Sequence, residues 1–165
     1  MRLSIVVPCY NEEPVLQETT VRLSAVLDSL VEKRKISSDS FILYINDGSR
    51  DMTWTIIESL HDRNSYVKGL NLAGNVGHQN ALMAGLMTAK GYADVLISID
   101  ADLQDDVSVI EEMVDRYKEG YDIVYGVRSS RDSDTFFKKN TALAFYKLMS
   151  WLGVKSVYNH ADYRL

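Results

Sequence analysis

The sequence predicts an α/β fold: a Rossmann-like sandwich with a mostly parallel central sheet and helices on both faces. Short apolar runs rich in β-branched residues recur along the chain, and stretches with helical spacing of apolar residues separate them. The length of 165 residues suits a single domain with its own core. Strands that alternate with helices are joined by right-handed crossovers and pair in parallel.

The predicted strands are five near-continuous apolar runs, as expected for strands that are covered on both faces. They lie at residues 3–7, 41–45, 67–72, 94–99 and 122–127.

The predicted helices fall between these strands and carry apolar residues three and four positions apart, which places them on one helical stripe. In chain order the stripes are Leu16, Thr20, Leu23, Leu27 and Leu30; Ile56, Ile57 and Leu60; Ala81, Leu82, Gly85 and Leu86; Val107, Ile110, Val114 and Tyr117; and Ala142, Phe145, Tyr146 and Met149.

Composition excludes several classes of protein. The net charge of −5 argues against a nucleic-acid partner, which would require a basic face. Cys9 is the single cysteine, so no internal disulfide can form, and we expect it to be a small buried residue beside Pro8. The sequence contains neither an apolar run near the roughly 20 residues that span a bilayer nor a signal peptide. We therefore expect this chain itself to be soluble and cytoplasmic.

Polar residues follow every predicted strand, at the sheet edge where open α/β sheets bind ligands. These clusters also have structural interpretations. Gly48 suits a turn with positive φ, and Ser49 or Asp51 suits a helix cap. Asp105 or Asp106 suits the N-cap of the fourth helix, and we expect His78 to be a loop or capping residue. The clusters are 8–13, 46–51, 74–78, 100–105, and Arg128 with Arg131.

The segment SIDADLQDD, residues 98–106, favours a metal site. Residues two apart in an extended segment point the same way, so Asp100 and Asp102 would repel each other and raise a pKa unless a cation relieved them. Gln104 offers a neutral oxygen on the same side. Mg²⁺ and Mn²⁺ prefer oxygen ligands, and Mg²⁺ often binds one or two carboxylates together with substrate phosphates. We therefore expect Mg²⁺ or Mn²⁺ carrying a diphosphate.

Other nucleotide and hydrolase motifs are absent from the sequence. PCYNEE follows the first strand in place of G-x-G-x-x-G, and neither a P-loop nor a G-x-S-x-G elbow occurs. The nucleotide chemistry that remains is the metal-assisted departure of a nucleoside diphosphate.

Four motifs, IVVPCYNEE, INDGSRD, NVGHQNAL and SIDADLQDD, resemble in order and spacing the inverting family 2 glycosyltransferases of GT-A fold. With VRSSRDSD and the terminal ADYRL, the chain looks most like the bacterial polyprenyl-phosphate glycosyltransferases related to dolichyl-phosphate mannose synthase. Many relatives carry arginine where this chain has Gly74.

The resemblance implies a role for individual residues. Asp47 would accept an N–H of the base, Asp100 would lie near the ribose or diphosphate, and Asp162 would act as a base or position the acceptor. Asp100, Asp102 and Asp162 are the expected catalytic residues. The expected nucleotide-binding residues are Pro8, Tyr10, Glu12, Asp47 and Asp100; the metal ligands are Asp102 and Gln104; and the acceptor-phosphate ligands are Arg128 and Arg131.

The resemblance also implies an activity. We expect a metal-dependent hexosyltransferase that moves a sugar from a nucleoside-diphosphate sugar, UDP rather than GDP, to a polyprenyl phosphate in cell-envelope glycan synthesis. Residues 1–165 would be a single catalytic domain that continues into juxtamembrane and membrane segments, at the cytoplasmic face of the inner membrane. An oligomer is compatible with this. The alternatives are a soluble family 2 enzyme with a sugar hydroxyl acceptor, and a non-catalytic nucleotide-binding domain.

Overall fold

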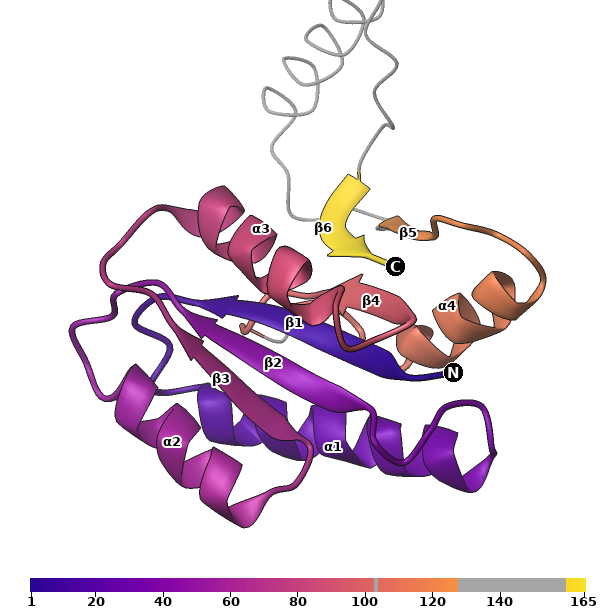
Figure 1. Cartoon of the computed structure of the whole chain (residues 1–165), viewed down its shortest axis with the longest axis horizontal. Coiled ribbons are helices and arrows are strands. Elements are labelled where there is room, and N and C mark those ends of the chain that lie inside the picture. The colour runs from indigo at the N-terminus through magenta and orange to yellow at the C-terminus, as the bar shows by residue number, and fades with distance from the viewer. Residues whose placement is uncertain (103, 128–159) are drawn as a thin grey trace, which may run out of the picture.

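The computed structural model describes residues 1–102, 104–127 and 160–165, and strands alternate with helices along it (Figure 1). The predicted α/β fold class is confirmed. The elements are β1 (Leu3–Cys9), α1 (Leu16–Glu32), β2 (Phe41–Asn46), α2 (Thr53–Arg63), β3 (Val67–Asn71), α3 (His78–Ala89), β4 (Val95–Ser98), α4 (Val109–Lys118), β5 (Tyr125–Val127) and β6 (His160–Arg164).

The sheet is mostly parallel, as predicted, with the strand order β3-β2-β1-β4-β6-β5. β1 pairs in parallel with β2 and β4, and β2 pairs in parallel with β3. β6 is antiparallel to both of its neighbours, β4 and β5. Because β2 and β4 flank β1 on opposite sides, the carboxyl end of β1 is the switch point at which such sheets bind ligands.

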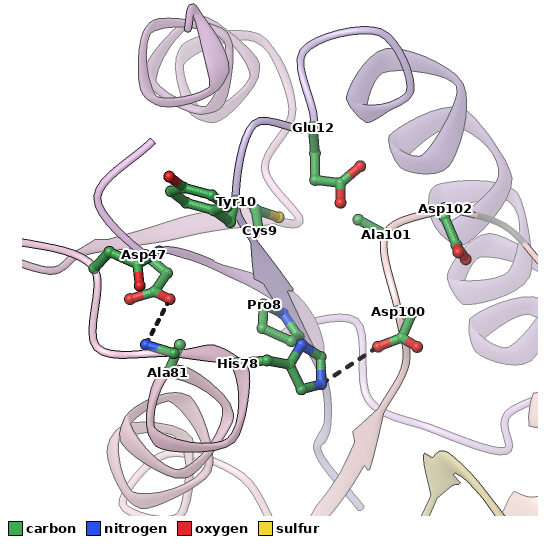
Figure 2. Close-up of a pocket in the computed structure, with 12 residues that line it drawn as sticks. Pro8, Cys9, Tyr10, Glu12, Asp47, His78, Ala81, Asp100, Ala101 and Asp102 are labelled. Carbon is green, nitrogen blue, oxygen red and sulfur yellow. Dashed lines mark hydrogen bonds and ion pairs between the residues drawn. The ribbon is translucent and has the colours of Figure 1, made fainter. Parts of the chain in front are cut away.

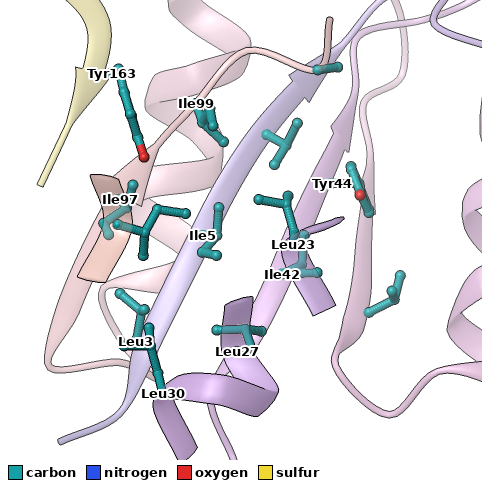
Figure 3. Close-up of a cluster of buried hydrophobic side chains, with 14 of the residues drawn as sticks. Leu3, Ile5, Leu23, Leu27, Leu30, Ile42, Tyr44, Ile97, Ile99 and Tyr163 are labelled. Carbon is teal, nitrogen blue, oxygen red and sulfur yellow. The ribbon is translucent and has the colours of Figure 1, made fainter. Parts of the chain in front are cut away.

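One face of the sheet packs against α1, α2 and α4 around alternate residues of the strands. Leu3 and Ile5 of β1 contact this core, in which Leu23, Leu27 and Leu30 of α1 are buried (Figure 3). The burial of each such side chain is worth about 1.5–3 kcal/mol. The stripe predicted for the first helix is therefore the stripe that holds α1 on the sheet.

The opposite face packs against α3, so helices cover both faces (Figure 1). Val6 and Ile45 point to this side, where Ala81 is fully buried. A Cβ on Gly85 would lie 2.5 Å from Ile45 Cδ1 and 2.7 Å from Val6 Cγ1. Glycine at 85 thus lets α3 approach the sheet closely.

Element ends differ from the prediction by a few residues. The fourth helix begins at Val109 rather than near Val107. The Asp106 carboxylate accepts the Ser108 N–H at 2.9 Å, and its carbonyl accepts the Val109 N–H at 3.2 Å, which makes 106–108 a turn. β5 is shorter than the predicted run 122–127, and β6 was not predicted as a strand.

The last predicted helix, with Ala142 and Phe145, lies outside the described residues. Among the helices that the structure describes, none has the length and apolar character needed to cross a bilayer.

Candidate active site

A cavity of about 300 Å³ lies at the carboxyl ends of β1, β2 and β4, beside the first turn of α3 (Figure 2). Five of the residues predicted from the strand ends line it together with Asp102, which was predicted as a metal ligand. These six are Pro8, Tyr10, Glu12, Asp47, Asp100 and Asp102. The cavity is also lined by residues that were not assigned to a site, namely Cys9, Asn75, Gly77, His78, Ala81 and Ala101.

The loop after β1 is fixed by hydrogen bonds to the loop after β2. Asn11, in the left-handed region with φ 57°, donates its N–H to Ser49 Oγ at 3.0 Å, and its Oδ1 accepts the Arg50 N–H at 2.9 Å. The Glu12 N–H donates to Thr53 Oγ1 at 2.9 Å. Ser49 therefore connects two loops instead of capping α2, whereas Asp51 accepts the Thr53 N–H at the start of that helix at 3.0 Å.

Asp47 connects the end of β2 to the loop before α3. Its side chain is almost fully buried, and its two carboxylate oxygens accept the backbone N–H groups of Val76 at 2.7 Å and Gly77 at 3.0 Å. Gly48 has φ 65°, as the turn prediction required, and a Cβ there would lie 2.5 Å from the Asn75 nitrogen. The two loops are thus in direct contact. The predicted bond from Asp47 to a nucleotide base stays a prediction.

The acidic segment after β4 faces Glu12 across the cavity (Figure 2). Burial raises the pKa of Glu12, and the negative charges of Asp102, Asp100 and Asp51 raise it further. The expected crowding of carboxylates therefore includes a third residue from the loop after β1. Asp102 is exposed, and its Oδ1 accepts the Gln104 N–H at 3.1 Å.

His78 is the first residue of α3, and its Nε2 lies 3.6 Å from Asp100 Oδ1. The expectation of a loop or capping role omitted this contact with the cavity. A signal was present in the sequence, because His78 follows the third strand and parallel strands deliver their carboxyl ends to one edge.

Cys9 is buried, as expected, and lines the same cavity. Burial and the nearby Glu12 raise the pKa of its thiol, which keeps it protonated and unreactive near neutral pH.

The sequence of residues 4–165 matches the family model Glycosyl transferase family 2. The chain belongs to this family. The family predicted from the four motifs is therefore confirmed.

Two curated relatives show which family 2 proteins this chain is similar to in sequence. It is 59% identical over 163 residues to the uncharacterized glycosyltransferase YkoT of Bacillus subtilis, covering 99% of this chain and 48% of that protein. It is 37% identical over 169 residues to the bactoprenol glucosyl transferase of Shigella phage SfV, covering 100% of this chain and 52% of that protein. The chain spans about half the length of the curated relatives it matches.

Solved structures share the fold of this family 2 chain. Glucosyl-3-phosphoglycerate synthase from Mycobacterium tuberculosis, in complex with Mn²⁺, UDP and glucosyl-3-phosphoglycerate, matches with a TM-score of 0.58 at 19% identity, over 99% of this chain and 55% of that one. S. aureus TarS in complex with UDP matches with a TM-score of 0.52 at 21% identity, over 82% of this chain and 38% of that one. The predicted GT-A fold is confirmed.

The donor set of this family 2 chain fits a divalent cation that binds together with a substrate. Within residues 1–102, 104–127 and 160–165, no group of three or more His, Cys, Asp or Glu side chains could by itself hold a metal. Asp102 lines the cavity with a hard oxygen donor, whereas Gln104, the other predicted ligand, is exposed and is not among the residues that line it. Mg²⁺ commonly completes a partial set of protein ligands with water and phosphate oxygens. A preformed protein cage is not required.

Three further predicted residues can be placed only in part. Arg128 and Arg131 lie outside the described residues. Asp162 lies in β6, which pairs Arg164 with Ser98 of β4 in antiparallel register. Its backbone is therefore towards the carboxyl end of β4, the end that Asp100 follows.

Proposed function

We propose that this domain transfers a hexose from a nucleoside-diphosphate sugar, UDP rather than GDP, to a polyprenyl phosphate in bacterial cell-envelope glycan synthesis. The observation that carries the proposal is the meeting of Glu12, Asp100 and Asp102 at one cavity on the carboxyl edge of a parallel sheet. Repelling carboxylates at a ligand-binding edge favour a site that a cation and a diphosphate complete. The bactoprenol glucosyl transferases at 37% identity support a lipid-linked acceptor and glucose as the first sugar to test.

The two sides of the cavity suit the two ends of a nucleotide sugar. Tyr10 and Asp47 lie on one side, and Asp100 and Asp102 lie on the other (Figure 2). The half-exposed Tyr10 ring offers a face for a base, and the neighbouring Pro8 also lines the cavity. We assign the nucleoside to the first side and the diphosphate to the second.

The proposed reaction is one in-line displacement. An acceptor oxygen attacks the anomeric carbon, the bond to the diphosphate breaks, and the configuration inverts. A phosphate acceptor is already ionised near neutral pH, so the site needs no strong general base. Asp162 would position the acceptor, with Arg128 and Arg131 as ligands of its phosphate because guanidinium groups match phosphate oxygens.

Asp102 and Gln104 would hold Mg²⁺ or Mn²⁺, which would neutralise the charge that develops on the departing diphosphate. The protein's own contribution is to orient these donors. The backbone N–H of Gln104 already bonds the Asp102 carboxylate, which restrains its rotamer.

The test is to incubate the complete protein with radiolabelled UDP-glucose, Mn²⁺ and polyprenyl phosphate, and then to extract with organic solvent. We expect label in the organic phase, dependent on both Mn²⁺ and the lipid. Label that stays in aqueous polysaccharide would point to a sugar hydroxyl acceptor instead. Folded protein that neither transfers nor hydrolyses any of a panel of UDP- and GDP-sugars would contradict the proposal and leave a binding domain.

A further inference from the structure

Thr19 of α1 contacts the acidic segment that follows β4. Its side chain is almost fully buried, and its Oγ1 lies 2.8 Å from the carbonyl oxygen of Ala101, 82 residues further along the chain. The same hydroxyl lies 2.9 Å from the carbonyl of Val15. The bond to Val15 is ordinary for threonine inside a helix. The approach to Ala101 is a tertiary contact that helix formation does not explain.

We propose that Thr19 is a positioning residue, whose hydroxyl holds the carbonyl of Ala101 and thereby fixes the backbone that carries the carboxylates of Asp100 and Asp102 at the cavity. The inference rests on the proposed function, in which these carboxylates meet the diphosphate and its cation. Thr19 itself would contact neither the diphosphate nor the cation. Ala101 lies between the two aspartates, buried, with Glu12 opposite (Figure 2).

The segment needs such a restraint because its charges push it away from the loop after β1. Residues 99–102 follow β4 without regular structure, and the Ile99 N–H donates to the Val6 carbonyl of β1 at 3.2 Å. Beyond that point the like-charged carboxylates of Glu12, Asp100 and Asp102 line one cavity and repel one another. A buried hydroxyl bonded to Ala101 opposes that repulsion.

Glu12 and Thr19 belong to one short stretch of chain. The Glu12 carbonyl accepts the N–H groups of Val15 at 3.1 Å and Leu16 at 3.2 Å, where α1 begins. The start of α1 therefore supplies both the repelling carboxylate and the restraining hydroxyl. The packing of α1 on the sheet therefore sets the distance of both groups from the acidic segment.

Thr20 provides a matched control, because it is the next residue, equally buried, and also hydrogen bonded through its hydroxyl. Its Oγ1 lies 2.8 Å from the Tyr44 hydroxyl, inside the core and away from the acidic segment. Thr20→Val thus removes a comparable buried hydroxyl, whereas Thr19→Val removes the one that contacts Ala101. Thr19→Ser retains that hydroxyl.

The experiment compares these three variants of the complete protein by hydrogen exchange, nucleotide binding and kinetics. In protein without nucleotide, we expect Thr19→Val to speed amide exchange in residues 100–105 roughly tenfold, since a buried carbonyl loses its donor. We expect Mn²⁺-dependent UDP binding to weaken roughly tenfold and the KM for the donor to rise, with the KM for the acceptor unchanged. Thr19→Ser should stay within about twofold of wild type in each measurement.

Any one of four results would overturn the inference. They are unchanged exchange in Thr19→Val, an unchanged donor KM in Thr19→Val, equal loosening of residues 100–105 in Thr20→Val, and failure of Thr19→Ser to restore UDP binding. If Thr19→Val does not fold, Thr19→Ala is compared with Thr20→Ala on the same readouts. The exchange measurement needs no turnover, so a wild-type protein that transfers no sugar would sink the proposed function separately. If the wild-type protein is active and Thr19→Val has the same KM for the donor, this inference is wrong and the proposed function still stands.

Discussion

Glu12 shows at the scale of one residue that the cavity is arranged for a ligand at some cost to the ligand-free fold. Its pKa is raised first by burial and then by Asp102 and Asp100, so the folded protein opposes its ionised form. A bound cation would reverse the sign of the local interaction, because opposite charges favour ionisation.

Glu12→Gln is expected to stabilise the ligand-free protein at pH 7. A carboxyl whose folded pKa is raised binds its proton more tightly in the native state, so it contributes stability below the ordinary glutamate pKa of about 4.3. That contribution is lost as the pH rises through the raised pKa. Removing the charge should therefore raise Tm at pH 7 by roughly 1–2 °C, the scale of a partly exposed charge interaction.

The gain from Glu12→Gln should disappear at pH 4, where the wild-type carboxyl is protonated, and thermal melts at both pH values measure it. Glu58→Gln, on the exposed surface of α2, is the matched control and should show no such pH dependence. A Glu12→Gln protein that is less stable than wild type at pH 7 would show that attraction, not repulsion, dominates around Glu12.

Asp102→Asn tests the metal assignment at the same scale. The substitution keeps the size of the side chain and removes the charge that would hold the cation, so turnover with Mn²⁺ should fall about 10²-fold or more. Steady-state rates at saturating donor measure the effect. Asp122→Asn, an exposed carboxylate between α4 and β5, serves as the control and should retain its rate. A near-wild-type rate in Asp102→Asn would remove Asp102 from the metal.

At the scale of an element, the close packing of α3 on the sheet shapes the cavity. α3 lies close to the sheet at Gly85, and its first turn carries His78 to within 3.6 Å of Asp100. Asp47 holds the preceding loop through two charge-assisted bonds. The position of the helix therefore sets one wall of the cavity.

Gly85→Ala should move that wall. The added methyl would lie 2.5 Å from Ile45 Cδ1, and overpacking of a core typically costs about 1–3 kcal/mol. The better helix propensity of alanine returns about 1 kcal/mol, so we expect a net loss of up to about 2 kcal/mol in the free energy of unfolding. Urea denaturation measures it. Gly91→Ala, whose Cβ would have its nearest neighbour at 3.9 Å, should cost nothing.

Local patterns were sufficient for the elements that bury a continuous stripe. Leu23, Leu27 and Leu30 have helical spacing, and their burial follows from it directly. β6 was missed because HADYR is short and its alternation rests on only two apolar residues, Ala161 and Tyr163, and because it pairs with β4 and β5 only through their tertiary arrangement. The start of α4 follows a turn in which the Asp106 carboxylate accepts the Ser108 N–H, and the spacing of apolar residues does not predict that turn.

The candidate site was predictable to the extent that it follows the strand ends. Asp47, Asp100 and Asp102 meet because the parallel topology delivers their strands to one edge. The bonds from Asp47 to Val76 and Gly77, and the approach of Thr19 to Ala101, depend on how separate loops and helices are seated. No spacing in the sequence encodes these distances.

Ligand binding can be tested at the scale of the whole molecule. A ligand that binds the native state stabilises it by mass action, by about 2.7 kcal/mol at a hundredfold excess over Kd. For a domain of this size that corresponds to a rise in Tm of roughly 5–10 °C. We expect UDP with Mn²⁺ to give the largest shift, and GDP with Mn²⁺ or UDP with EDTA to give less. A larger shift with GDP would reverse the proposed nucleotide preference.

The place of β6 between β4 and β5 determines when the sheet can be finished during synthesis. Strands β1 to β4 leave the ribosome early and can pair while translation continues. One edge of β4 stays unpaired until residues 160–164 have been synthesised. Until then that edge presents unsatisfied backbone groups to any neighbouring extended chain. A nascent chain stalled before residue 160 would thus be a target for chaperones, although most of its core is already formed.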